Sequence, residues 1–150
     1  MTVLTTVDRE LLRRAVDLAS HAQRSTTAFS VGAVVADAEG TVLSTGFSRQ
    51  VDPHDHAEEV ALSTLDMDDP RLRTATVYSS LEPCSTRSSR PRSCTALILA
   101  TPIPRIVFAW REPDVFVDCE GAELLRAAGR EVIEVPEFAG AARKPNAHLL

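Results

Sequence analysis

Two strands and a helix follow one another closely in residues 31–62, VGAVVADAEGTVLSTGFSRQVDPHDHAEEVAL, and this stretch decides the fold. Residues 31–37 and 41–47 are predicted strands, and the Ala-Glu-Gly sequence between them is typical of a turn. The shortness of that turn predicts a hairpin. A polar loop containing Pro53 follows, and a helix is expected over residues 57–65.

Helices and strands alternate on both sides of this stretch. A helix is expected over residues 8–23, where apolar side chains recur at helical spacing. Further strands are predicted at 74–80, 105–110 and 131–135, and further helices at 94–100 and 122–128. Because a helix separates the fourth and fifth strands, these two should be parallel. The sequence predicts an α/β fold in a single domain, residues 1–150, with one mixed sheet and helices on both faces. The tail, residues 145–150, either docks as a last turn or frays.

The amino-acid composition and net charge limit the classes of protein to which the chain can belong. The chain has 150 residues, of which 44% are hydrophobic and 25% are charged, as in ordinary globular domains. It contains no apolar run long enough to cross a bilayer, and its first residues lack the order of a signal peptide, so a cytoplasmic location is expected. A net charge of -5 argues against nucleic acid as a partner. Three cysteines in such a chain favour a metal or a catalytic thiol over disulfides.

The candidate metal-ligating and catalytic residues occur in a characteristic order along the chain. His56 and Glu58 stand at the start of a predicted helix, Pro83 and Cys84 follow a predicted strand, and Cys94 starts a later helix. This order is the signature of zinc-dependent deaminases. Three protein ligands leave a fourth zinc position open for water. The pKa of a zinc-bound water falls from roughly 15.7 to about 7.

Glu58 is the predicted proton carrier, because it lies in the same first turn as His56 without being needed as a ligand. The alternative interpretation is a surface helix start and two unlinked thiols. A structural zinc module that only binds a partner is a further alternative. It would need a fourth protein ligand, and no fourth cysteine lies nearby. His54 is a rival ligand by spacing, although only His56 has a glutamate two positions later.

Several stretches resemble the pyrimidine deaminases of riboflavin biosynthesis. They are FSVGAVV, VLSTGFSR, HAEEVAL, VYSSLEPCSTRSS, FAWREPDVFV and CEGAELLRAAGREV, and they cover about residues 29–135. The fungal deaminase domain is the nearest match, because its loop between the two cysteines is also enlarged. Here that loop comprises nine residues, 85–93.

The resemblance implies a three-layer α-β-α fold of the cytidine-deaminase type with a five-stranded mixed sheet. It implies one zinc ion per chain, with His56, Cys84 and Cys94 as ligands and Glu58 as proton shuttle. It also implies hydrolytic attack on a small aminopyrimidine and at least a homodimer. Ser30 stands where the family often has an asparagine that contacts substrate, and Ser93 stands where the family usually has proline.

The loop between the cysteines is rich in serine, arginine and proline, a composition that suits an anion. Arg87 is the predicted contact to a substrate phosphate, with Ser85 or Ser88 assisting. For Arg90 and Arg92, a solvated basic loop is an equally good explanation. For Glu82, a structural role is at least as good an explanation as contact with substrate, and Cys119 is expected to pack as a small apolar group.

The first functional hypothesis is a hydrolase that removes ammonia from a phosphorylated riboflavin-pathway pyrimidine, a diamino-ribosylamino- or ribitylamino-pyrimidinone phosphate. The alternatives in the same class are a deaminase of cytidine or deoxycytidylate and a deaminase of secondary metabolism. Ser30 and the absence of an attached reductase domain keep these alternatives open.

Overall fold

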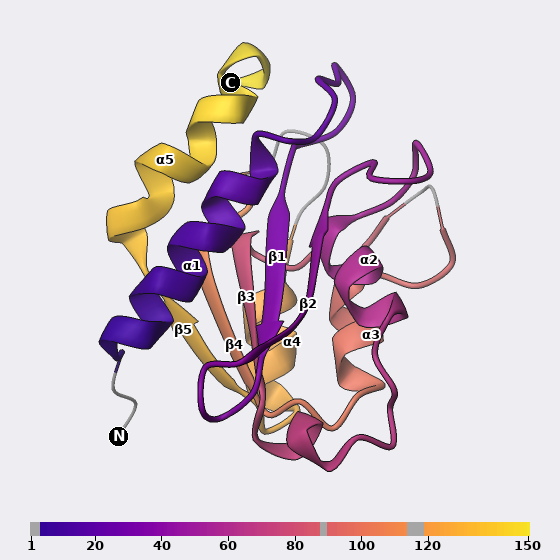
Figure 1. Ribbon diagram of the computed structural model, residues 1–150. Helices are drawn as coiled ribbons and strands as arrows, with labels where there is room; N and C mark the ends of the chain where they lie inside the picture. Colours follow the sequence, from indigo (N-terminus) through magenta and orange to yellow (C-terminus); the bar gives the residue numbers. More distant parts are fainter. Residues whose placement is uncertain (1–3, 88–89, 114–118) are drawn as a thin grey trace.

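Five strands form one mixed sheet at the centre of the computed structural model (Figure 1). The structure describes residues 4–87, 90–113 and 119–150. In spatial order the strands are β2 (Val42–Phe47), β1 (Gly32–Ala36), β3 (Thr76–Leu81), β4 (Arg105–Trp110) and β5 (Glu131–Glu134). β1 is antiparallel to β2 and β3, whereas β4 is parallel to β3 and β5. The predicted five-stranded mixed sheet, with its fourth and fifth strands parallel, is confirmed.

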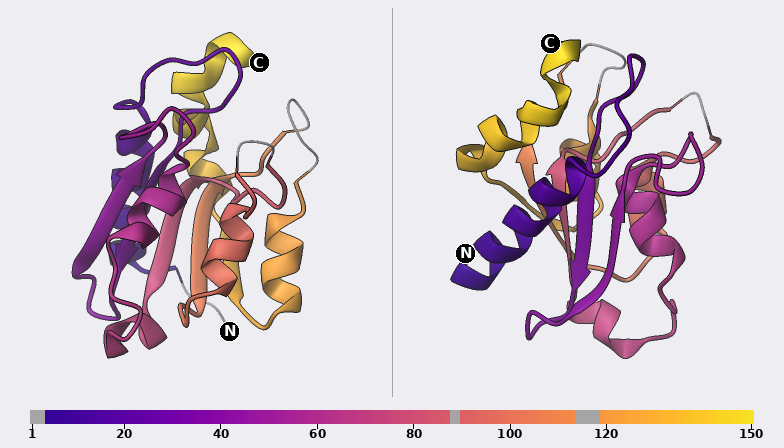
Figure 2. Two further views of the ribbon diagram at one scale, coloured as in Figure 1. Left: turned by 90° about the vertical axis from the view of Figure 1, so that its right-hand side faces the viewer. Right: turned by 45° about the horizontal axis from the view of Figure 1, so that its top comes forward.

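Helices cover both faces of the sheet, which makes three layers (Figure 2). α1 (Thr6–Ala19) and α5 (Ala139–Arg143) pack on one face. The opposite layer contains α2 (Ala57–Ser63), α3 (Cys94–Leu99) and α4 (Gly121–Ala127). The predicted α-β-α arrangement is therefore correct. No helix within the described ranges has the length and apolar character needed to span a membrane.

Two glycines let helices approach the hairpin closely. A Cβ on Gly32 would collide with the carbonyl oxygen of Ala15 in α1, and a Cβ on Gly46 would collide with that of Ala57 in α2. Each strand therefore contacts a helix backbone where any larger residue would push the helix away. The second contact fixes the start of α2, which carries His56 and Glu58.

α1 is shorter than predicted. It begins with a capping box between Thr5 and Asp8, and it ends at Ala19 instead of continuing to residue 23. After Ala19, backbone amides bond to carbonyls three residues back, and the Ser20 hydroxyl donates to the Asp17 carbonyl at 2.7 Å. These local bonds replace the helical ones, because serine offers the backbone an alternative partner.

The C-terminal segment docks, and it is more helical than the sequence indicated. Two 3₁₀ helices, Pro136–Phe138 and Lys144–Leu149, flank α5, and this unit packs against β4 and β3. The buried Asn146 side chain accepts a hydrogen bond from the Ser30 amide at 2.6 Å and donates one to the Ser30 carbonyl at 3.0 Å. The tail thus fixes the position of Ser30, which lies just before the start of β1.

A buried ionic network joins α1 to the sheet. Arg105 donates two hydrogen bonds to the Asp8 carboxylate, at 2.7 and 2.8 Å, and the Tyr78 hydroxyl donates a third at 2.6 Å. Burial alone would raise the pKa of Asp8. Hydrogen bonds from Arg105, the Thr5 amide and Tyr78 outweigh it and hold the pKa well below its usual value.

Candidate metal centre and active site

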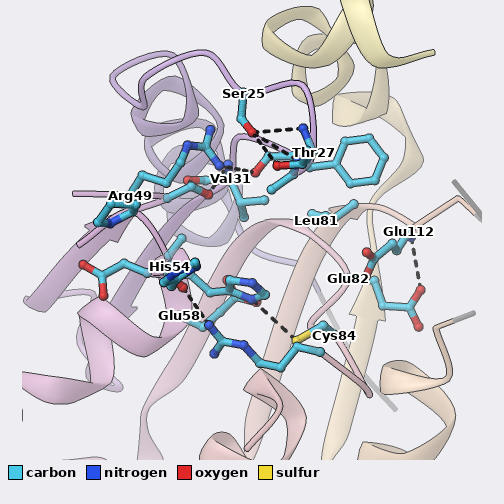
Figure 3. A pocket seen from close by; sticks show the side chains of 18 of the residues that line it. Ser25, Thr27, Val31, Arg49, His54, Glu58, Leu81, Glu82, Cys84 and Glu112 are labelled. Carbon is cyan, nitrogen blue, oxygen red and sulfur yellow. Dashed lines mark hydrogen bonds between the residues drawn. The ribbon is translucent and has the colours of Figure 1, made fainter. Parts of the chain in front are cut away.

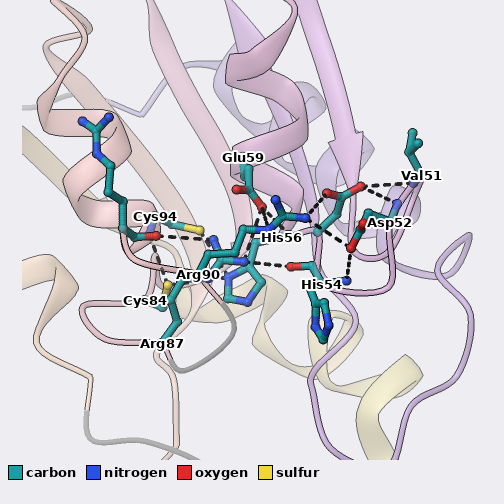
Figure 4. Close-up of polar contacts among 11 residues, drawn as sticks. Val51, Asp52, His54, His56, Glu59, Cys84, Arg87, Arg90 and Cys94 are labelled. Atoms are coloured by element: carbon teal, nitrogen blue, oxygen red, sulfur yellow. Dashed lines mark hydrogen bonds and ion pairs between the residues drawn. The ribbon is translucent and has the colours of Figure 1, made fainter.

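Three metal-ligating side chains meet where β3 ends and where α2 and α3 begin (Figure 4). His56 is the residue before α2, Cys84 follows β3, and Cys94 is the first residue of α3. The Nδ1 atom of His56 lies 3.3 Å from the Cys94 sulfur and 3.6 Å from the Cys84 sulfur. All three ligand atoms lie within 4.8 Å of one another.

These distances fit tetrahedral zinc. Zinc bonds of about 2.0–2.1 Å to nitrogen and about 2.3 Å to sulfur place neighbouring ligand atoms roughly 3.5–3.8 Å apart. The observed separations of His56 Nδ1 from the two sulfurs, 3.3 and 3.6 Å, are close to that spacing. A hydrogen bond between the two cysteine side chains lowers the pKa of Cys84 and raises that of Cys94. The two sulfur atoms thus share one proton. A metal ion would displace that proton.

Glu58 lies beside this group and is 4% exposed. Burial raises the pKa of Glu58 to about 7, and the negative charge of Cys84 adds to the effect. A carboxyl with a pKa near neutrality can both accept and deliver a proton, which is what a general acid and base must do. Glu58 is also in the first turn of α2, so the same helix start positions it and His56.

A cavity of ≈ 510 Å³ opens onto the site (Figure 3). His56, Glu58 and Cys84 line it, as does Arg87 from the loop between the cysteines. Its remaining polar lining includes Ser25, Thr27, Ser48, Arg49, His54, Asp55, Glu82 and Glu112. The volume lies in the usual range for small-ligand sites, about 300–1,000 Å³.

Glu59 ties the loop between the cysteines to the start of α2. Its carboxylate accepts a hydrogen bond from the His56 amide at 3.3 Å, which completes the cap of the helix. The same carboxylate lies 3.3 Å from Arg87 and 3.6 Å from Arg90. The Arg87 side chain is only 2% exposed and also donates to the His54 carbonyl at 2.8 Å. Arg90 pairs in addition with Asp52 and Asp55, at 3.2 and 3.3 Å.

The predicted substrate contacts occupy different environments. Arg87 lines the cavity, but its charge faces Glu59. The Ser85 hydroxyl accepts a hydrogen bond from the Glu120 amide at 2.9 Å, where α4 begins. Ser30 is buried under the tail, outside the lining of this cavity. Ser88 lies outside the described residues. The proposed contacts of all four residues with substrate stay predictions.

The remaining candidates have mainly structural surroundings. Glu82 is 1% exposed, and its carboxylate accepts hydrogen bonds from the amides of Glu112 and Ala122, at 3.2 and 2.9 Å. The Cys119 thiol donates to the Pro83 carbonyl at 3.3 Å. His54 lines the cavity, whereas the metal-ligating group found in the described part of the chain contains His56.

Two cavity residues were not predicted as site residues, although both lie in stretches that carry the family resemblance, VLSTGFSR and FAWREPDVFV. Glu112 follows β4; burial raises its pKa to about 7, and its buried Oε2 has no hydrogen-bond partner within the described ranges. Arg49 follows β2 and is described below. Both stand at loop positions where residue type and spacing alone indicate no role, and the fold brings them to the cavity.

Three comparisons with known proteins agree on the family. Residues 5–110 match the model of the cytidine and deoxycytidylate deaminase zinc-binding region. The chain is 41% identical over 131 residues to a diaminohydroxyphosphoribosylamino-pyrimidine deaminase of Schizosaccharomyces pombe, covering 86% of this chain and 32% of that protein. It is 34% identical to a riboflavin biosynthesis protein RibD of Aquifex aeolicus, covering 84% of this chain and 34% of the relative.

A solved structure also resembles the fold. It is the diaminohydroxyphosphoribosylaminopyrimidine deaminase/reductase of Thermotoga maritima, with a TM-score of 0.79 and 29% identity. The match covers 93% of this chain and 39% of the other. The chain thus spans about a third of the length of the curated relatives named above.

Proposed function

Because this chain belongs to the family with the cytidine and deoxycytidylate deaminase zinc-binding region, we propose that it hydrolytically removes ammonia from a small phosphorylated aminopyrimidine. One observation carries the proposal: a buried carboxyl, Glu58, lies beside three metal-ligating side chains and lines the same cavity as two of them. A closed structural zinc site would have no use for a buried carboxyl that lies beside the metal-ligating group and faces a cavity.

His56, Cys84 and Cys94 would hold the zinc ion, which as a Lewis acid makes a water molecule a better nucleophile at neutral pH. Glu58 would take the proton from that water and deliver it to the ring nitrogen of the substrate. It would then supply a proton to the departing amino group, so one carboxyl serves as base and as acid. The walls of the cavity would hold the ring in reach of Glu58.

The name of the Schizosaccharomyces pombe relative suggests the substrate class, a pyrimidine with a phosphoribosylamino group. The mixed lining of the cavity supports a substrate of this kind, since carboxyl groups, hydroxyls and a guanidinium can recognise amino groups, a sugar and a phosphate. The name of the matching family model favours a second candidate, a cytidine or deoxycytidylate substrate. A homodimer and a cytoplasmic location stay predictions.

Ammonia release distinguishes these candidates. Zinc-loaded protein should be assayed with the phosphoribosylamino-pyrimidine, its dephosphorylated form, cytidine and deoxycytidylate. We expect the highest kcat/KM for the phosphoribosylamino-pyrimidine. A higher kcat/KM for cytidine or deoxycytidylate would instead support the second candidate substrate. No ammonia from any of the four compounds would refute both.

A further inference from the structure

Arg49 has an unusual backbone conformation at the wall of the cavity. Its φ is 58°, and it is the single non-glycine residue with positive φ within the described ranges. The left-handed region is unfavourable for an ordinary residue, so such residues persist where their surroundings require them. Here the conformation directs the guanidinium back to the loop that precedes β1.

Neutral acceptors hold the Arg49 guanidinium. It donates to the Gln23 carbonyl at 2.7 and 3.0 Å, to the Phe29 carbonyl at 3.2 Å and to the Ser30 hydroxyl at 2.6 Å. None of the ion pairs found among the described residues involves Arg49. Burial lowers its pKa, and no neighbouring carboxylate acts in the opposite direction.

The other arginine of the cavity differs in this respect. Arg87 faces the Glu59 carboxylate at 3.3 Å, so its charge is already balanced within the protein. Arg49 contributes a positive charge that no carboxylate of the described chain balances at close range. A partly buried cation in this state attracts an anion more strongly than a paired one does.

Hydroxyl groups lie beside this charge. Ser25 and Thr27 line the same cavity, and Figure 3 shows them with Arg49 on the side opposite Cys84. The Ser25 oxygen accepts hydrogen bonds from the amides of Thr27 and Ala28, at 3.1 and 3.2 Å. Because this oxygen already accepts two hydrogen bonds, the Ser25 hydroxyl donates its proton to the Thr27 hydroxyl oxygen, 3.3 Å away. The Thr27 hydroxyl proton can then be donated to a ligand. Guanidinium and hydroxyl donors together are the usual partners of a phosphate.

We propose that Arg49, with the hydroxyls of Ser25 and Thr27, forms the subsite for the phosphate of the substrate, across the cavity from the metal-ligating residues. The inference rests on the proposed function for the identity of the substrate. It differs from the sequence-based hypothesis, which gives the phosphate to Arg87. The long loop between the cysteines then stabilises the metal site, because its arginines pair with Glu59 at the start of α2.

Kinetics on two substrates test this subsite. Arg49→Gln should lower kcat/KM about ten- to a hundredfold for the phosphorylated pyrimidine, as expected for loss of a charged hydrogen bond. The dephosphorylated analogue should show little loss, and Arg49→Lys should recover part of the phosphate preference. Arg24→Gln removes an exposed positive charge outside the cavity and should leave both values unchanged. If Arg49→Gln lowered kcat/KM equally for the two substrates, Arg49 would only stabilise the loop before β1 and would not bind the phosphate.

Arg87→Ala should be assayed in the same way for comparison. If Arg87→Ala lowered kcat/KM for the phosphorylated substrate alone and Arg49→Gln did not, the proposal would be overturned. Binding of ribose 5-phosphate and of ribose, followed by NMR titration of the zinc-loaded protein, separates the subsite from the reaction. Arg49→Gln should weaken the binding of ribose 5-phosphate alone. Absent or Arg49-independent binding of ribose 5-phosphate would contradict the subsite. Arg49-dependent binding in a protein that releases no ammonia would preserve the subsite and refute the proposed function.

Discussion

At the scale of single residues, Glu58 and Glu59 show how neighbours in one helical turn take different roles. Glu58 is buried, lines the cavity and has a pKa raised to about 7 by that burial. Glu59 points toward Arg87 and Arg90 and caps the helix. The H-x-E pattern predicts a proton carrier at Glu58 from local sequence, and that role stays a prediction. The role of Glu59 depends on a loop that lies far along the chain.

Glu58→Gln should abolish most of the activity while leaving the fold and the zinc content intact. We expect a loss of at least about three orders of magnitude in kcat, because the amide can neither accept nor deliver the proton in the two steps. Ammonia release and metal analysis on the same preparation would measure both properties. Glu10→Gln, at an exposed position of α1, is the matched control. Near-normal turnover by Glu58→Gln would show that another group carries the proton.

At the scale of elements, local patterns predicted the helices and strands well but did not predict their side-chain partners. β4 begins and ends at the predicted residues, and α2 and α3 begin where the motif residues required. The C-terminal helical unit was missed, because Ala-Gly-Ala-Ala-Arg is too short to show a clear apolar stripe. The contacts of Asn146 with Ser30 and of Arg49 with Gln23 join distant segments, so no local pattern indicates them.

The contact between α1 and the sheet should depend on pH through Asp8. The pKa of Asp8 is depressed in the folded protein, so the ionised carboxylate stabilises the fold above the unfolded pKa of about 3.9. This contribution is lost as the pH falls from there toward the folded pKa. Asp8→Asn leaves the Arg105 charge without its main partner and should cost about 3 kcal/mol at pH 7.

Urea unfolding at several pH values between 7 and 3 would measure the difference in stability between wild type and Asp8→Asn. The difference should be constant down to about pH 5 and shrink below it, where the unfolded carboxylate begins to take up protons. A difference that stays constant throughout would contradict the assigned role of the ionised carboxylate. Glu10→Gln again supplies the control, since its carboxylate is exposed.

At the scale of the whole molecule, the site is made by the meeting of elements that are separate in the sequence. The ends of β3 and β4 and the starts of α2 and α3 converge, while the segment before β1 and the residue after β2 form the other side of the cavity. The order of the motif residues was enough to predict the metal-ligating group. The side of the cavity formed by Ser25, Thr27 and Arg49 could be found only once the chain was folded.

The zinc coordination itself is the central claim, and X-ray absorption at the zinc edge of the loaded protein tests it most directly. Ligation by His56, Cys84 and Cys94 predicts two sulfur neighbours at about 2.3 Å and two nitrogen or oxygen neighbours at about 2.0–2.1 Å. One of these last would be the imidazole and the other a solvent oxygen. Cys84→Ser should reduce the sulfur number to one, whereas Cys119→Ser should leave it at two. A site with no sulfur, or with three or more sulfur ligands, would contradict the account.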